Sequence, residues 1–141
     1  MRKEFQQRLA SEYRYAANKM QETPAPTKKL FYFSVLFGES QRVLNWEWDR
    51  DLSLVYTMTQ YVYNQFNATM QIPGLMQIPI EWAAVYEKLT QITSDIASYY
   101  EKIETEENRE EMYQILGRLA EIGYAVTGNG SYLYEKEMFK L

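Results

Sequence analysis

The stretch from Trp82 to Ile103, WAAVYEKLTQITSDIASYYEKI, decides the fold class of this chain. Its apolar residues recur at alternating steps of three and four, the heptad pattern of a helix that packs at about 20° to its neighbours. The pattern resumes between Met112 and Val126, so the two segments are predicted to form an antiparallel helical hairpin with a turn near Glu104 and Thr105. The apolar residues of this pattern are Trp82, Val85, Leu89, Ile92, Ile96, Tyr99 and Ile103, then Met112, Ile115, Leu119, Ile122 and Val126.

Three further helices are predicted upstream of this hairpin. The first runs from Arg2 to Gln21 and ends before the prolines at 24 and 26, which cannot continue a helix. The second runs from about Thr27, its expected N-cap, to Asn45, and the third runs to about Met70 from a cap supplied by Asp49 or Asp51. The residues expected to face the core are Leu9, Tyr13, Ala16 and Met20 in the first helix and Leu52, Val55, Val62 and Phe66 in the third.

The last part of the chain completes the predicted architecture. Thr105 is the expected cap of the fifth helix, the glycines at 128 and 130 end that helix, and a short final helix is expected from Tyr132 to Lys140. The prediction is an all-α fold, an antiparallel helical bundle of five main helices plus a short C-terminal helix. A length of 141 residues and an apolar fraction of 46% suit one domain over residues 1–141.

The chain contains no cysteine and no histidine. Without cysteine there are no disulfides, thiolate metal sites or thiol nucleophiles, and without histidine the commonest general acid–base and metal ligand is missing. No phosphate-binding glycine loop and no serine nucleophile motif occurs. We therefore expect no catalytic residue and no cofactor, which favours a non-enzymatic role.

The densest acidic cluster lies between Glu101 and Glu111. Paired Glu-x-x-Glu motifs on facing helices bind magnesium in all-α nucleotide pyrophosphohydrolases, and such oxygen-only sites need no histidine. A Mg-dependent nucleotide hydrolase is therefore an alternative, with Glu101, Glu104, Glu107 and Glu110 as candidate metal ligands. The heptad register turns all four side chains outward, whereas a metal site in a bundle needs inward carboxylates, so a solvated charged surface is the favoured interpretation.

The charge distribution suggests a second alternative. The net charge is −4, but residues 1–48 carry eight Lys/Arg against five Asp/Glu, a net of +3, and residues 81–141 carry six against twelve, a net of −6. In the basic part, Arg8, Arg14, Tyr15 and Lys19 combine cations with an aromatic ring, which permits phosphate contact and base stacking. The chain could then be a small helical subunit of a nucleoprotein complex, although its overall acidity disfavours nucleic acid as a partner.

Self-association is the best-supported functional prediction from the sequence. The helix over 27–45 is apolar on every side from Leu30 to Phe37, so one neighbouring layer cannot cover it, and its Gly38 is interpreted as a close helix crossing. Monomers rarely expose large apolar patches, and symmetric dimers are the commonest way to cover one. We predict a homodimer with interface residues Leu30, Phe31, Phe33, Phe37, Trp46, Trp48, Leu75, Met76 and Ile78. The alternative is that this helix is simply the central helix of a monomer.

The location of the protein follows from missing signals. Residues 1–8 lack the apolar core of a signal peptide, and the longest apolar stretch, residues 30–37, is far shorter than the roughly 20 residues of a bilayer helix. We expect a cytoplasmic protein without membrane contact. Its predicted function is a non-enzymatic interaction or assembly module whose partner is a second copy or another protein subunit.

Overall fold

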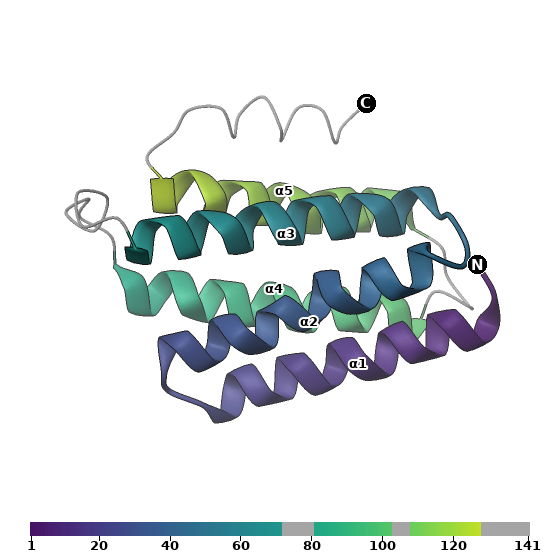
Figure 1. Ribbon diagram of the computed structural model, residues 1–141, viewed down its shortest axis with the longest axis horizontal. Coiled ribbons are helices and arrows are strands. Elements are labelled where there is room, and N and C mark those ends of the chain that lie inside the picture. Colours follow the sequence, from purple (N-terminus) through teal and green to yellow (C-terminus); the bar gives the residue numbers. More distant parts are fainter. Residues whose placement is uncertain (72–80, 103–107, 128–141) are drawn as a thin grey trace.

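The computed structural model describes residues 1–71, 81–102 and 108–127, and it is all-helical over these residues (Figure 1). The helices are α1 (Lys3–Glu22), α2 (Pro26–Leu44), α3 (Arg50–Gln71), α4 (Trp82–Lys102) and α5 (Arg109–Thr127). The predicted all-α class is therefore confirmed, and the predicted bounds of the first three helices agree with the observed ones to within a residue or two. The expected final helix over 132–140, the 72–79 loop and the expected turn near Glu104 and Thr105 lie outside the described residues.

The N-cap of α2 differs from the predicted one, and the N-cap of α3 is one of the two predicted residues. Thr27 is not the N-cap of α2, because the helix begins at Pro26 and its N-cap is Ala25, which makes no side-chain capping bond. Asp49, rather than Asp51, caps α3, since its Oδ1 accepts a hydrogen bond of 2.9 Å from the backbone N–H of Leu52. In α5 the side chain of Asn108 accepts a hydrogen bond from the N–H of Glu111.

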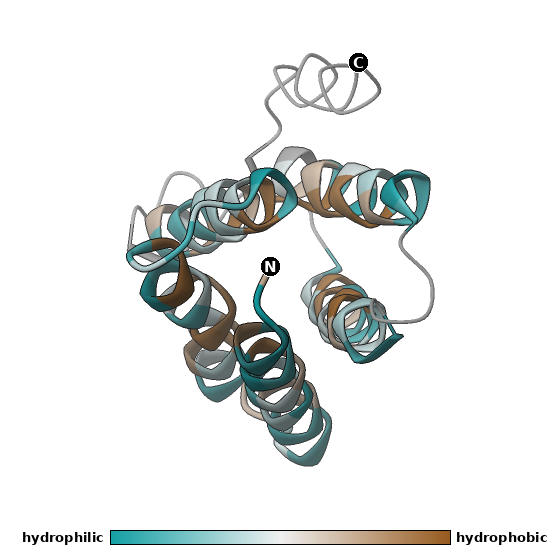
Figure 2. Ribbon diagram, turned by 90° about the vertical axis from the view of Figure 1, so that its right-hand side faces the viewer, coloured by the Kyte–Doolittle hydropathy of each residue, from teal (hydrophilic) through white to brown (hydrophobic). Residues whose placement is uncertain are grey.

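The helices surround one core, viewed end on in Figure 2, where their apolar sides turn toward one another. Helix α1 packs on α2 and α4, α3 packs on α2 and α5, and α4 closes the ring against α5. All the heptad residues in the described helices are buried except Trp82, which is half-buried. The largest fully buried side chains come from all five helices: Leu9, Tyr13, Met20, Phe33, Leu36, Leu52, Phe66, Leu89, Ile96, Tyr99, Tyr100 and Met112.

Helices α4 and α5, which the sequence predicts to form a hairpin, are less closely packed than their sequence pattern suggests. Helix α4 packs more extensively on α1 than on α5. A cleft of about 290 Å³ lies between α4 and α5, and its lining includes Val85, Ile92, Ile122 and Ala125. The heptad pattern correctly identifies the buried face of α4, but the main partner of that face is a helix more than sixty residues away in sequence.

The interpretation of Gly38 as a close helix crossing is wrong. A Cβ atom at Gly38 would have no heavy atom of a neighbouring element within 4 Å. The close approach occurs instead at Gly123 of α5, where a Cβ would lie 3.2 Å from Cε1 of Tyr61 on α3. Among the helices that the structure describes, none combines the length and the hydropathy needed to cross a membrane.

Candidate interaction surface

The turn between α2 and α3 presents two tryptophans to solvent. Trp46 is 77% exposed and Trp48 is 72% exposed, more than any other large hydrophobic residue in the described part of the chain. Trp82, in contrast, is half-buried and packs on the rings of Phe66 and Tyr86. Exposed tryptophan is unusual because the indole ring is large and mostly apolar, and tryptophan is enriched at protein interfaces.

The backbone and neighbouring side chains hold this turn in place. The N–H groups of Trp46 and Glu47 each donate a 2.9 Å hydrogen bond to the carbonyl oxygen of Val43. Asp49 caps the helix that follows, and the carboxylate of Glu47 lies 3.5 Å from Nε of Arg2 on the N-terminal segment. The exposure of the two indole rings is thus a consequence of a defined turn between two helices.

Beside Trp46 lies an open cavity of about 300 Å³. It is lined by Phe5 and Arg8 of α1, Arg42 and Val43 of α2, and Asn45 and Trp46 of the turn. Aromatic and aliphatic walls with two arginines at the rim are typical of a site that takes an apolar group next to a negatively charged one.

The two arginines share one buried carboxylate. Nε of Arg8 lies 2.9 Å from Oε2 of Glu39, and Nη1 of Arg42 lies 3.2 Å from Oε1 of the same side chain. The hydrogen bond with Glu39 raises the pKa of Arg8, and the charge of Glu39 adds to the effect. Two guanidinium groups therefore share the carboxylate of Glu39, and the charge of Glu12 also acts on Arg8. Arg42 keeps donors free, because Glu39 is its sole acidic partner among the described residues.

The start of α5 and the end of α4 lie at the same end of the bundle as the turn (Figure 1). The carboxylate of Asp51, three residues after Trp48, lies 3.7 Å from Nε of Arg109 at the start of α5. Lys102 at the end of α4 pairs with Glu111 at 2.9 Å. We call this end, made by residues 2–8, 42–51, 100–102 and 108–113, the tryptophan end. The contacts that join its five helix ends are Arg2–Glu47, Gln6–Tyr100, Asp51–Arg109, Lys102–Glu111 and Arg50–Tyr113.

The remaining predicted interface residues divide into three groups. Leu30 and Phe33 are 4% and 0% exposed, so the structure corrects their assignment: they belong to the core of the chain itself. Phe37 is half-buried, with its ring centroid 5.1 Å from that of Tyr63, whereas Phe31 is 65% exposed near the start of α2. Leu75, Met76 and Ile78 lie outside the described residues.

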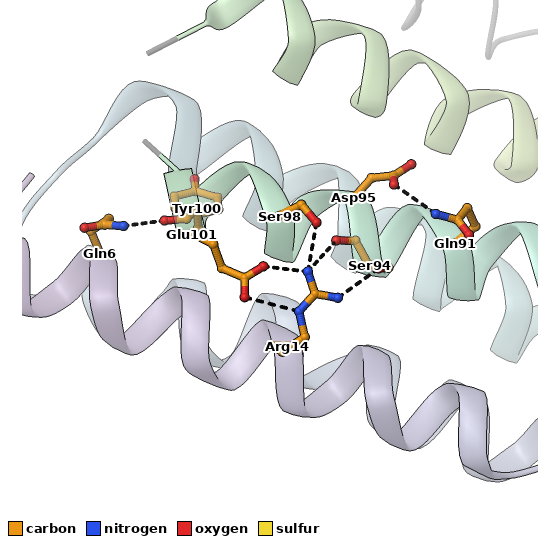
Figure 3. Close-up of polar contacts among 8 residues, drawn as sticks. All are labelled: Gln6, Arg14, Gln91, Ser94, Asp95, Ser98, Tyr100 and Glu101. Atoms are coloured by element: carbon orange, nitrogen blue, oxygen red, sulfur yellow. Dashed lines mark hydrogen bonds and ion pairs between the residues drawn. The ribbon is translucent and has the colours of Figure 1, made fainter. Parts of the chain in front are cut away.

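The predicted nucleic-acid residues have partners within the chain. Arg14 reaches from α1 to α4, where it donates to the hydroxyls of Ser94 and Ser98 and pairs with Glu101 at 2.6 Å (Figure 3). Arg8 forms an ion pair with Glu39. Nζ of Lys19 lies 3.4 Å from Oε2 of Glu22 and 5.8 Å from the ring centroid of Tyr15. Tyr15 is 48% exposed. These cations lie on α1, but the guanidinium of Arg14 binds residues of α4 and is therefore not available to a phosphate group.

The candidate metal ligands are not brought together by the part of the chain that the structure describes. Glu101 pairs with Arg14, Glu110 is exposed in the first turn of α5, and Glu104 and Glu107 lie outside the described residues. No group of three or more acidic side chains within residues 1–71, 81–102 and 108–127 is arranged to hold a metal ion.

Sequence reasoning missed Glu39, Arg42 and Phe5 as members of the surface. Glu39 and Arg42 are three residues apart on one helix, a spacing at which opposite charges meet. Their ion pair could therefore have been predicted from the sequence. The contact of Arg8, on α1, with Glu39, on α2, could not have been predicted from the spacing of residues in the sequence. The chain matches no family model, no curated protein and no solved structure at a significant level.

Proposed function

We propose that the chain is a non-enzymatic interaction module that self-associates as a homodimer through the tryptophan end. The observation that carries the proposal is the exposure of Trp46 and Trp48 on a hydrogen-bonded turn. Neither ring contributes to the core, so their retention on the surface needs another explanation, and contact with a partner supplies one.

The energetics of association favour these two residues as anchors. Fully burying one large apolar side chain contributes about 1.5–3 kcal/mol, and an aromatic ring in a pocket is the commonest kind of interface anchor. In a two-fold symmetric dimer each of the two positions contributes two buried rings, one from each copy. The cavity next to Trp46 offers a ready recess for a side chain of the partner.

The proposal includes two finer features of the fold: an antiparallel arrangement of the bundle and a short final helix over residues 132–140. Contacts between α1 and α2 support the first feature, since Arg2 pairs with Glu47 while Lys29 donates to the carbonyl of Met20. The sequence after Gly130, with Tyr132, Leu133, Met138 and Phe139, supports the second.

Sedimentation equilibrium tests the proposed dimer. The wild-type chain should have about twice the 16.8 kDa of one chain at micromolar concentration. The Trp46→Ala/Trp48→Ala double variant should sediment near 16.8 kDa with an unchanged helical circular dichroism spectrum. Phe31→Ala, at the other end of α2, is the matched control and should stay dimeric.

Each other result has a defined meaning. A wild-type mass of 16.8 kDa at micromolar concentration would overturn the dimer and leave another protein as the partner of the tryptophan end. A dimer that survives loss of both tryptophans but not loss of Phe31 would move the interface to the opposite end of α2.

A further inference from the structure

We infer that the Arg42 side of the tryptophan end binds the start of α5, at Glu110, of a second copy of the chain. The inference rests on the proposed self-association and adds the chemistry of the contact. In this arrangement the rim of the cavity beside Trp46 meets the partner's carboxylate, and the exposed indole rings exclude water from the contact.

The two complementary patches lie on the same end of each molecule. Figure 2 looks onto this end, with the α2–α3 turn on one side and the start of α5 on the other. The ion pair between Asp51 and Arg109 links the two sides, because Asp51 follows Trp48 by three residues and Arg109 adjoins Glu110. One end therefore carries both a basic aromatic patch and an acidic one.

The charges of the patches are opposite. On the basic side, Arg8 and Arg42 share the single carboxylate of Glu39. On the acidic side, Glu110 is exposed, and its side chain forms no ion pair or hydrogen bond with any residue that the structure describes. Beside it, Glu111 pairs with Lys102 and Arg109 pairs with Asp51, so among the described residues at the start of α5 Glu110 is the carboxylate that no internal cation neutralises.

Two-fold symmetry converts this arrangement into a closed contact. In a two-fold dimer the same patch serves both subunits, and residue i of one copy meets residue j of the other while j meets i. An axis through the tryptophan end would place Arg42 of each copy against Glu110 of the other, so that the charged contact forms twice. A guanidinium–carboxylate pair also fixes orientation, since its hydrogen bonds are directional.

Reciprocal charge reversal tests the inference. Arg42→Glu and Glu110→Lys should each weaken dimerisation at least tenfold, since each places like charges at both contacts. An equimolar mixture of the two variants should restore a dimer of wild-type affinity, because the mixed dimer contains one native pair and one inverted pair. The measurement is sedimentation equilibrium of each variant and of the mixture, with one chain tagged to distinguish the species.

Matched variants separate the specific contact from general effects. Lys28→Glu and Glu87→Lys make the same charge changes at exposed positions on α2 and α4 that lie outside the tryptophan end, and they should leave the dimer unchanged. Arg42→Glu places a second carboxylate beside Glu39 and could impair folding. Arg42→Gln avoids this problem, because it removes the positive charge and leaves the pair of Arg8 with Glu39 intact. It should weaken the dimer severalfold.

The outcomes distinguish the inference from the proposed function. A wild-type dimer that tolerates Arg42→Glu, Arg42→Gln and Glu110→Lys would overturn the inference while leaving self-association in place. If Arg42→Glu and Glu110→Lys are both folded but their mixture forms no dimer, the inference is also overturned, because the inverted pair should attract as strongly as the native one. A monomeric wild-type chain would overturn both.

Discussion

The guanidinium group of Arg14 on α1 binds the carboxylate of Glu101 on α4, with Nη2 2.6 Å from Oε1 and Nε 3.3 Å from Oε2. The same guanidinium donates hydrogen bonds of 2.9 Å and 2.8 Å to the hydroxyls of Ser94 and Ser98 (Figure 3). One side chain thus connects α1 to two turns of α4. A residue that the sequence offers as a nucleic-acid contact serves as a link between helices.

Replacement of Arg14 should therefore lower stability. We expect Arg14→Gln to reduce the free energy of unfolding by about 1–2 kcal/mol, because several partly buried hydrogen bonds to a charged donor are lost at once. Glu101→Gln should cost less, below about 1 kcal/mol, since that carboxylate is largely solvated. Urea unfolding followed by circular dichroism measures both, with the exposed Lys28→Gln as the control. An Arg14→Gln variant as stable as the control would contradict the assignment.

Two of the helical glycines, Gly38 and Gly123, should respond differently to alanine. Gly38→Ala adds a methyl group in open space, so it should stabilise the chain by about 0.5–1 kcal/mol through helix propensity and reduced freedom of the unfolded chain. Gly123→Ala places a Cβ 3.2 Å from the ring of Tyr61, so the ring must shift and the gain should be smaller or reversed. Thermal unfolding of both variants tests the order. Equal gains would mean that α3 and α5 are not in close contact at Gly123.

The cap of α3 should contribute to stability through a single side-chain oxygen. Asp49→Ala removes the acceptor for the N–H of Leu52 and should cost about 1 kcal/mol, while Asp49→Asn should retain most of the stability. The measurement is the midpoint of urea unfolding. Since Asp49 follows Trp48 directly, the alanine variant should also change the fluorescence of the exposed tryptophans; an unchanged midpoint would show that the cap carries little of the turn's stability.

Stability should fall at alkaline pH because buried tyrosines resist ionisation. Burial raises the pKa of Tyr86 to about 12 and raises the pKa values of Tyr13 and Tyr100 well above the usual range of tyrosine. Tyrosine in the unfolded chain ionises near pH 10, so above that pH the folded state holds more protons and the free energy of unfolding decreases. This contribution is complete below about pH 10 and is lost as the pH rises toward the folded pKa.

Urea unfolding at a series of pH values checks this dependence. The slope above about pH 10 should become shallower in Tyr86→Phe, which removes one of the responsible groups. A free energy of unfolding that is constant from neutral pH to pH 12 would rule out the burial of these hydroxyl groups.

The sequence by itself determined which segments are helical and which side of most helices is buried. Leu89 and Ile96 of α4 and Met112 and Leu119 of α5 are each 0% exposed, as their spacing predicts. The reason is physical: helix periodicity is a local property, since the 3.6-residue repeat lines up residues of one segment on one face. The two prolines and the acidic cap of α3 are equally local signals, and they place the ends of the first three helices to within a residue or two.

Only the tertiary structure decided which surfaces meet. Apolar burial is non-directional, so the pattern of α4 does not reveal that its main partner is α1. It equally leaves open that Phe33 enters the core while Phe31, two residues away on the opposite side of α2, is 65% exposed. The pairing of Arg14 with Glu101 and of Arg8 with Glu39 depends on the packing angle between helices, which no local spacing encodes. The cavity beside Trp46 exists for the same reason, because the fold places Phe5 and Arg8 of α1 against Arg42 and Trp46, which lie far from them in the chain.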